Sequence, residues 1–346
     1  MNIAFIMDHW SYLKPDSDST LVLIHEALLR NHNVGILNPE NLTIRDSVTT
    51  GFFDIVADFE KLPDNTTDLH KKIKFNRKML PLAGFDVIFM RADPPIDNIV
   101  LNFLDSVKNE TFILNDIDGL REANNKIYTA AFYDPNNEMI PATYVSRNKE
   151  YIKEIIRKSK KDKMIMKPLN GFGGSGVIVI EKNAMLNINS LLDFYISDDN
   201  KNNYVILQEY VDGAEKGDVR VLLLNGEPIG ALRRVPAIDD PRSNVSAGGK
   251  IEKHTLTKKE LELSRVIGAQ LVKSGLYLAG LDIINNKLIE VNVTSPGGIS
   301  HINLLNKSKL QEQILDFAEG IVFQKERAID KKFELRKIFS DAKNEK

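Results

Sequence analysis

Two carboxylates and a carboxamide flank a short turn in the last third of the chain. Glu290 and Asn292 are two residues apart in the alternating run 288–293, so they share one face of a predicted strand. Asp282 precedes the turn at Asn285-Asn286 and can point to the same side. Hard oxygen ligands at this spacing suit Mg²⁺ that is held jointly with substrate phosphates. A half-exposed strand with outward polar residues explains the pattern equally well.

A glycine-rich loop lies earlier in the chain. Residues 171–176 satisfy the dinucleotide-binding pattern G-x-G-x-x-G, but that pattern requires a helix after the loop. The apolar run 177–181 predicts a strand instead, so we expect a hairpin whose backbone N–H groups converge on phosphate. A merely flexible hairpin tip is the alternative. Lys167 ends the preceding strand, where its ammonium can meet a phosphate as a point charge.

A third feature lies between these two motifs. The strand expected at 204–211 ends in Gln208-Glu209-Tyr210-Val211, where backbone groups can hydrogen-bond an adenine edge. An ordinary strand end would have the same sequence. The three features occur in the order lysine with glycine hairpin, strand end and acidic hairpin. That combination is more specific for a nucleotide site than any one of its parts.

The first third of the chain alternates apolar strands with helical patterns. Strands are expected at 3–7, 34–37, 86–90 and 111–114. A helix is expected at 21–29, capped by Ser19 or Thr20. This alternation predicts a parallel sheet, whose ligands lie beyond the carboxyl ends of the strands. Residues at such ends are Asp8, Arg91 and Asn115. The polar segment 45–80 is expected to be an insertion or long loop.

A second unit is expected from residue 121. A helix is predicted over 120–132, and the rest is richer in strands. Strands are expected at 142–146, 164–167, 177–181, 204–211, 219–224, 229–235, 278–284 and 288–293, and helices at about 148–160, 186–196, 257–273 and 308–322. We therefore predict an α/β domain over 1–120 followed by an α+β domain over 121–322. A charged extension follows over 323–346, as a surface helix or an oligomer contact.

Composition excludes several classes of protein. The formal net charge is -2, so no global basic field exists to bind nucleic acid or an anionic membrane. No apolar run approaches the roughly 20 residues of a membrane span, and the first residues lack the pattern of a secretory signal. The chain contains no cysteine, which excludes disulfides, thiolate metal sites and a cysteine nucleophile. We expect a cytoplasmic protein.

Over residues 1–320 the chain resembles the prokaryotic glutathione synthetases of the ATP-grasp superfamily. The stretches that carry the resemblance are Asp18-Ser19-Thr20, Met90-Arg91-Ala92-Asp93-Pro94-Pro95, Asn124-Asn125-Lys126, Lys167-Pro168-Leu169, Asp218-Val219-Arg220-Val221, Arg234-Val235-Pro236, 244–249 and Asn292-Val293-Thr294-Ser295-Pro296. The resemblance implies a pre-ATP-grasp, Rossmann-like parallel-sheet domain, followed by a two-part ATP-grasp domain. The parts would be a lid subdomain at about 138–203 and a core at 204–322.

The resemblance also implies a role for individual residues. ATP would be bound by Lys126, Lys167, Gly171, Gly173, Gly174, Gln208, Glu209, Tyr210 and Val211. Mg²⁺, with Mn²⁺ as an alternative, would be held by Asp282, Glu290 and Asn292. The catalytic cations would be Arg220, Lys167 and Arg234. The substrates would be held by Ser19, Arg91, Arg234, Asn244, Gly248 and Gly249.

The implied reaction joins γ-glutamylcysteine and glycine to glutathione through an acyl phosphate, with ADP and phosphate released. The implied assembly is a homo-oligomer, such as a homotetramer. Residues 297–301, Gly-Gly-Ile-Ser-His, depart from a run found in enterobacterial members and leave the amine partner open. Two alternatives remain: another ATP-grasp carboxylate–amine ligase, or a non-catalytic ATP-binding regulatory protein.

Overall fold

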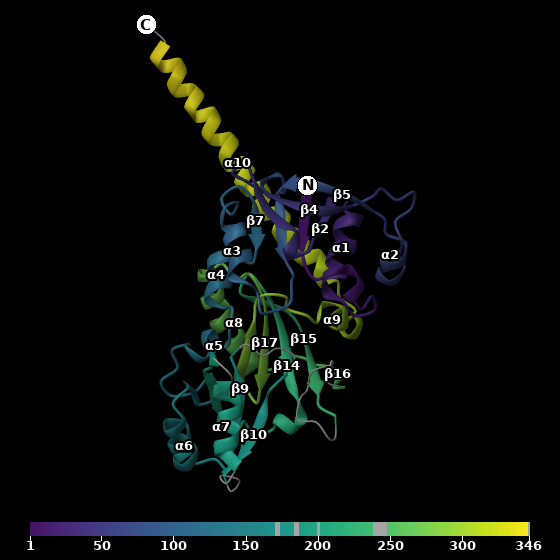
Figure 1. Cartoon of the computed structure of the whole chain (residues 1–346). Coiled ribbons are helices and arrows are strands. Elements are labelled where there is room, and N and C mark those ends of the chain that lie inside the picture. Colours follow the sequence, from purple (N-terminus) through teal and green to yellow (C-terminus); the bar gives the residue numbers. More distant parts are fainter. Residues whose placement is uncertain (170–173, 183–186, 199–200, 238–247, 345–346) are drawn as a thin grey trace. The chain divides into compact units, whose positions relative to one another are not determined.

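The structure is a computed structural model, and it describes residues 1–169, 174–182, 187–198, 201–237 and 248–344. The chain forms two compact units (Figure 1). Unit 1 comprises Met1–Ala92, Ile99–Leu114 and Lys309–Lys346, and unit 2 comprises Asp93–Asn98 and Asn115–Ser308. Among the helices that the structure describes, none is both long and apolar enough to cross a membrane.

Unit 1 is built on a seven-stranded sheet in the order β3-β4-β2-β1-β6-β7, with β5 paired to β4. The parallel strands are β1 (Asn2–Ile6), β2 (Asn33–Leu37), β6 (Val87–Met90) and β7 (Phe112–Leu114). Nearly all their side chains are buried, as is typical of a parallel sheet covered on both faces. The predicted parallel sheet is confirmed.

Of the two interpretations of 45–80, an insertion or a long loop, the long loop is wrong. The segment contains most of an antiparallel extension of the same sheet, formed by β3 (Leu42–Arg45), β4 (Val48–Val56) and β5 (Phe75–Pro81). Asp46 and Ser47, both with positive φ, make the two-residue turn between β3 and β4. The polar side chains of β5 are exposed on an edge strand, so apolar patterning could not reveal it.

The described part of unit 1 contains four α-helices. They are α1 (Ser19–Leu29), α2 (Thr66–Lys72), α3 (Asn98–Asp105) and α10 (Leu310–Asn344). The cap of α1 differs from the prediction, because the Asp18 carboxylate accepts a hydrogen bond of 2.8 Å from the Leu21 N–H. Ser19 and Thr20 already belong to the first turn and are buried.

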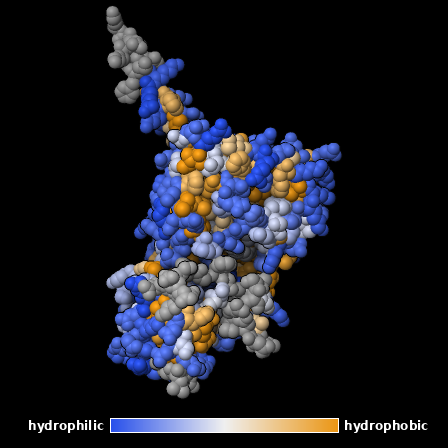
Figure 2. All heavy atoms as spheres, in the orientation of Figure 1, coloured by the Kyte–Doolittle hydropathy of each residue, from blue (hydrophilic) through white to orange (hydrophobic). Residues whose placement is uncertain are grey.

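Helix α10 groups with unit 1, whereas the sequence placed the end of the ATP-grasp domain at residue 322. Its first half is anchored there by Phe317, which packs edge-on to Phe112, and by ion pairs from Arg30 to Asp316 and Glu319. From residue 323 to residue 337 the helix is exposed, and Figure 2 shows apolar side chains among charged ones on it. The exposed apolar residues there are Phe323, Ile329, Phe333 and Leu335.

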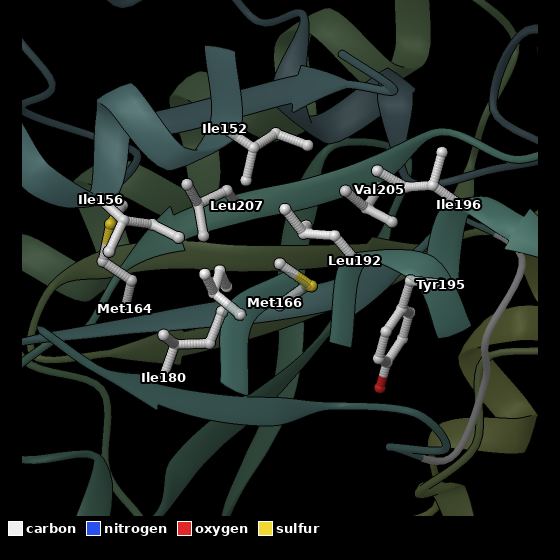
Figure 3. Close-up of a cluster of buried hydrophobic side chains, with 11 residues drawn as sticks. Ile152, Ile156, Met164, Met166, Ile180, Leu192, Tyr195, Ile196, Val205 and Leu207 are labelled. Atoms are coloured by element: carbon white, nitrogen blue, oxygen red, sulfur yellow. The ribbon is translucent and has the colours of Figure 1, made fainter. Parts of the chain in front are cut away.

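Unit 2 contains a four-stranded antiparallel sheet in the order β10-β9-β13-β8. Its strands are β8 (Thr143–Ser146), β9 (Lys163–Pro168), β10 (Ile178–Glu181) and β13 (Val205–Glu209). Helices α6 (Lys149–Lys158) and α7 (Ile188–Ile196) contribute to an apolar core on one face of the sheet (Figure 3). Because β9 and β10 pair antiparallel, the predicted hairpin around the glycine loop is confirmed.

A five-stranded antiparallel sheet, in the order β16-β15-β14-β17-β18, forms the rest of unit 2. Its strands are β14 (Asp218–Leu224), β15 (Glu227–Val235), β16 (Lys250–Lys253), β17 (Leu278–Ile284) and β18 (Lys287–Asn292). Helix α8 (Lys258–Lys273) packs against β14 and β15 and begins with a capping box of Thr257 and Glu260. Helix α9 (Ile299–Asn306), which was not predicted, packs against β15 and β16.

The helix predicted over 120–132 is broken. The structure has α4 (Ile117–Glu122) and α5 (Ile127–Ala130), with a turn between them. The Asn125 side chain accepts a hydrogen bond from the Ile127 N–H and so starts the second helix. The break leaves Lys126 at the N-cap of α5.

The shorter elements are η1 (Trp10–Tyr12), η2 (Pro39–Asn41), η3 (Leu82–Gly84), η5 (Ala214–Lys216), β11 (Ser197–Asp198) and β12 (Lys201–Asn202).

Candidate active site

A row of charged side chains crosses the five-stranded sheet of unit 2. Asp218 on β14 faces Arg234 on β15, and Arg220 on β14 faces Asp282 on β17. Asp282 in turn faces Glu290 on β18. Residues that face each other on neighbouring strands, or lie two apart on one strand, share one face of a sheet. The sheet therefore brings together five charged residues from four strands.

The centre of this row is a buried network of two arginines and two aspartates. Arg220 binds Asp282 through two hydrogen bonds, Nε to Oδ1 at 2.6 Å and Nη2 to Oδ2 at 3.1 Å. Arg234 binds Asp218 through Nε at 2.9 Å and through Nη2, and its Nη2 lies 2.9 Å from Asp282 Oδ1. Paired guanidinium and carboxylate groups hold each other in fixed orientations. Both arginines are therefore positioned before any ligand binds.

The charges in this network are stabilised by each other. Burial alone would raise the pKa of Asp282, but the guanidinium groups of Arg220 and Arg234 outweigh it and hold that pKa well below its usual range. Burial likewise opposes the charge of Arg234, and the carboxylates of Asp282 and Asp218 nevertheless raise its pKa. Asp282 and Arg234 are therefore ionised at neutral pH.

The three residues expected to hold a metal ion lie together. The Asn292 amide donates to Asp282 Oδ2 at 3.3 Å, and Glu290 Oε1 accepts a hydrogen bond of 2.7 Å from Lys126 Nζ. Two carboxylates and a carboxamide provide the hard oxygen atoms that Mg²⁺ prefers. Within the described residues, no group of three or more His, Cys, Asp and Glu could hold a metal ion by itself. The donor set thus fits Mg²⁺ only together with oxygen atoms from a ligand.

Lys167 lines a small, partly open cavity in unit 2. Residues from several elements line the cavity: Lys126, Thr129, Ala130, Thr143, Lys167, Ile206, Gln208, Ile289 and Glu290. Burial lowers the pKa of Lys167 to about 8, with a smaller contribution from the Lys126 ammonium, while the carboxylates of Glu290 and Asp282 oppose the shift. The cavity therefore presents two ammonium groups beside the acidic hairpin, an arrangement that suits a polyphosphate.

In the predicted adenine-binding segment, 208–211, several hydrogen-bonding groups already bind within the protein. The Gln208 side chain binds Lys167 Nζ and Thr143, so it belongs to the lining of the cavity. The N–H groups of Glu209 and Tyr210 donate to backbone carbonyls of Ala142 and Lys163. An adenine edge at this segment would therefore use its carbonyl oxygens or the N–H of Val211.

The glycine loop and the segment that contains Asn244, Gly248 and Gly249 are described only in part. Gly171, Gly173 and Asn244 lie outside the described residues. Gly174 and Gly248 both have positive φ, at 77° and 91°, and a Cβ on Gly248 would meet nothing within 4 Å. Gly249 follows it, half-buried, just before β16. The positive φ values of Gly174 and Gly248 favour glycine, and the predicted roles of all six residues stay predictions.

The two predicted substrate residues of unit 1 lie next to each other. Arg91 follows β6, is buried, and donates from Nε to the Thr20 hydroxyl at 3.0 Å. Ser19 precedes Thr20 in the first turn of α1 and is also buried. A guanidinium beside a helix N-terminus is suited to a carboxylate ligand. Ser19 and Arg91 thus lie at the expected edge of the sheet of unit 1, and their role in binding substrate stays a prediction.

Sequence reasoning missed two threonines of the cavity in unit 2, and it did not foresee the contacts of residues 297–301, which it had singled out. Thr143 and Thr129 line the cavity, but threonines in a strand and a short helix carry no functional signal. Gly297 accepts a hydrogen bond of 3.3 Å from Arg220 Nη1 through its carbonyl, so the unusual segment 297–301 contacts a predicted catalytic residue. His301 lies in α9, and burial lowers its pKa. The departure of this segment from the enterobacterial run was the available signal.

Comparisons with known proteins agree with this geometry. The chain matches the family "Prokaryotic glutathione synthetase, N-terminal domain" over residues 1–121 and the family "Prokaryotic glutathione synthetase, ATP-grasp domain" over residues 125–307. It is 34% identical to the glutathione synthetase of Gloeobacter violaceus over 92% of this chain and 96% of the relative. It is also 34% identical to that of Thermosynechococcus vestitus, over 91% of this chain and 98% of the relative.

Solved structures share the fold at low sequence identity. The D-cycloserine synthetase DcsG has a TM-score of 0.63 at 13% identity, covering 93% of this chain and 99% of that chain. An ATP-grasp ligase associated with RiPPs in Chryseobacterium gregarium has a TM-score of 0.61 at 16% identity, covering 92% and 96%. The predicted ATP-grasp fold is thereby confirmed. The chain belongs to the prokaryotic glutathione synthetase family and is an ATP-dependent carboxylate–amine ligase.

Proposed function

We propose that this chain joins the cysteinyl carboxylate of γ-glutamylcysteine to the amine of glycine, with ATP converted to ADP and phosphate. The observation that carries the proposal is the charged row across the five-stranded sheet beside the cavity of Lys126 and Lys167. The row supports activation of a carboxylate by phosphorylation, because that reaction needs cations in fixed positions and no nucleophile from the protein. Family membership supports the choice of substrates.

A carboxylate is a poor acyl donor, because its charge repels an amine and oxide is a bad leaving group. Transfer of the γ-phosphoryl group from ATP to the carboxylate gives an acyl phosphate. Attack by the amine on the carbonyl carbon then expels phosphate, and the amine loses a proton. Both steps require positioning and charge neutralisation more than covalent help from the protein.

The cations of unit 2 would divide this work. Lys126 and Lys167 border one cavity and would bind phosphate oxygens of ATP. Arg220 would meet the transferred phosphoryl group, and Arg234 would meet the acyl phosphate or the carboxylate of the acceptor. Because Asp218 and Asp282 already hold both guanidinium groups, little reorganisation is needed during the reaction.

Asp282, Glu290 and Asn292 would hold a divalent cation, Mg²⁺ or Mn²⁺, together with the ATP phosphates. When bound, the cation would supply further neutralisation of phosphate charge. In the structure, Asp282 accepts hydrogen bonds from Arg220, Arg234 and Asn292, and Glu290 accepts one from Lys126. Arg220, Arg234 and Lys126 thus pair with the carboxylates of the acidic hairpin.

The remaining predicted residues would hold the two substrates and exclude water. Arg91 and Ser19 would bind γ-glutamylcysteine at the edge of the sheet of unit 1. Asn244, Gly248 and Gly249 would lie at the acceptor carboxylate with Arg234. Because an acyl phosphate hydrolyses in water, the glycine hairpin at 171–176 and the segment 239–249 would close over the site.

Two further proposals follow from family membership. We propose that the chain acts in the cytoplasm, where ATP and a reduced thiol substrate are available together. We also propose that it assembles as a homo-oligomer, such as a homotetramer. Sedimentation of the purified chain tests the assembly, and a single boundary at the monomer mass of 39.1 kDa would contradict it.

A substrate panel tests the proposed function. ADP release would be measured for the purified chain with MgATP, γ-glutamylcysteine and a set of amines. Turnover should depend on both γ-glutamylcysteine and glycine, with glutathione formed in equal amount to ADP. Turnover only with another acid or amine would assign the chain to the alternative ligases. ATP binding without turnover on any pair would favour the regulatory alternative.

A further inference from the structure

Three polar side chains form a connected line on one face of the four-stranded sheet. Lys167 lies on β9, Gln208 on β13 and Thr143 on β8, and Gln208 faces Thr143 directly across the strand pair. Lys167 faces Ile206, two residues before Gln208 and so on the same side. The opposite face carries the apolar core (Figure 3). The three polar side chains therefore share the face that borders the cavity.

The direction of each hydrogen bond in this line is fixed by the first one. Thr143 Oγ1 lies 2.6 Å from the Pro141 carbonyl oxygen, which can only accept, so the hydroxyl donates its single proton there. Towards Gln208 the hydroxyl can then only accept, and Gln208 Nε2 lies 2.8 Å away. The amide oxygen must consequently face Lys167 Nζ, which donates to it at 2.8 Å.

A reversed amide would be costly at this place. It would set the Gln208 NH₂ group against the Lys167 ammonium and its oxygen against a hydroxyl that has no proton left to donate. Lys167 is only 7% exposed, so no water replaces a lost acceptor at low cost. The Thr143 hydroxyl thereby keeps the Gln208 amide oxygen, a hydrogen-bond acceptor, next to the buried Lys167 ammonium.

This acceptor matters because the ammonium lies among several charges. The Lys126 ammonium and the carboxylates of Glu290 and Asp282 all act on it. An ammonium has three N–H donors, so a fixed bond to Gln208 on one side directs the other two elsewhere. The cavity beside Lys167 is where a phosphate would receive them.

We propose that Thr143 is a positioning residue for ATP binding, which acts through Gln208 to direct the Lys167 ammonium toward a phosphate in the cavity. The inference deepens the proposed function and rests on it only in taking the phosphate to be that of ATP. Thr143 needs no contact with the nucleotide itself.

Two substitutions at one position test the role of the hydroxyl. The dissociation constant of MgATP would be measured by titration calorimetry on the full chain without the acid substrate. Thr143→Val keeps the shape of the side chain and removes the hydroxyl, and should weaken binding about tenfold, as the loss of one hydrogen bond implies. Thr143→Ser keeps the hydroxyl and should bind within about twofold of the unchanged chain. In steady state, Thr143→Val should raise the KM for ATP more than it lowers kcat.

A double-mutant cycle separates this role from a general loss of structure. If Thr143 acts through Gln208, Thr143→Val should cost almost nothing further in a chain that carries Gln208→Leu. Thr129→Val is the matched control, since it removes a hydroxyl from the same cavity without touching the line, and its effect should add to that of Gln208→Leu.

Additive effects of Thr143→Val and Gln208→Leu, or equal losses in the Val and Ser variants, would overturn the inference. This test can succeed or fail independently of the test of the proposed function, because it measures ATP binding and not glutathione synthesis. Non-additive binding in a chain that makes no glutathione would leave the inference standing and remove the proposed substrates. Glutathione synthesis together with additive effects of the two substitutions on ATP binding would support the proposed substrates and overturn the inference about Thr143.

Discussion

Replacing Lys167 by methionine should make the chain more stable at neutral pH while it weakens ATP binding. Lys167 is buried, and its pKa of about 8 lies below the ordinary 10.5. That difference corresponds to about 3 kcal/mol by which folding disfavours the charged form. Methionine has a similar length and no charge, but it loses the hydrogen bond to Gln208, which costs about 1 kcal/mol. The net gain at pH 7 is about 2 kcal/mol.

The sign of this effect should change with pH. Below pH 8 the lysine is protonated in both the folded and the unfolded chain, so the full penalty is present. Between pH 8 and pH 10.5 the unfolded chain binds more protons than the folded chain, and the stability of the unchanged protein rises. Above pH 10.5 the penalty is gone, and Lys167→Met should be the less stable protein by about 1 kcal/mol.

Urea unfolding at pH 7 and at pH 10.5 would measure this difference at each pH. Lys158→Met is the control, because Lys158 is exposed and its ion pair within the described part of the chain is with Glu154 on its own helix. That variant should stay within about 0.5 kcal/mol of the unchanged chain at both pH values. A Lys167→Met protein that is equally destabilised at pH 7 and pH 10.5 would refute the reasoning that Lys167 is held as a buried, costly cation.

Three further substitutions have distinct expected outcomes. Asp282→Asn should lower the unfolding free energy by about 3 kcal/mol, because two buried guanidinium groups lose their shared carboxylate; unchanged urea unfolding would contradict the network. Gly217→Ala should lower it by at least about 2 kcal/mol, because its φ is 92° and a Cβ would lie 1.9 Å from the Arg234 carbonyl oxygen. The control is Gly213→Ala, where φ is also positive but the added Cβ lies in open space, and it should lower the unfolding free energy less. A Gly213→Ala protein that melts at a lower temperature than the Gly217→Ala protein would contradict this. Glu290→Gln should abolish turnover and leave the circular dichroism spectrum unchanged; an unaltered rate would remove Glu290 from the metal site.

Local sequence patterns predicted the elements that form the core of the site. The hairpin of β17 and β18 follows from alternating apolar residues around Asn285-Asn286, whose positive φ values suit a tight turn. The glycine hairpin follows from the apolar run after the loop. Each of these features is encoded within about ten neighbouring residues, so a single sequence suffices to find it.

Features that depend on distant parts of the chain could not be found in the same way. The pairing of Arg220 with Asp282 joins β14 to β17, and only the resemblance suggested that Arg220 has a role. The edge strand β5 shows polar residues outward, so its pattern is that of a loop. Thr143 gains its place from the pairing of β8 with β13, which no local pattern encodes.

The central claim is that the carboxylate of γ-glutamylcysteine is activated as an acyl phosphate. The most direct measurement uses γ-glutamylcysteine with ¹⁸O in its cysteinyl carboxylate, incubated with the purified chain, glycine and MgATP. Because the amine expels phosphate together with one carboxylate oxygen, each phosphate released should carry one ¹⁸O atom, as mass spectrometry would detect. Glutathione formation with unlabelled phosphate would contradict the account.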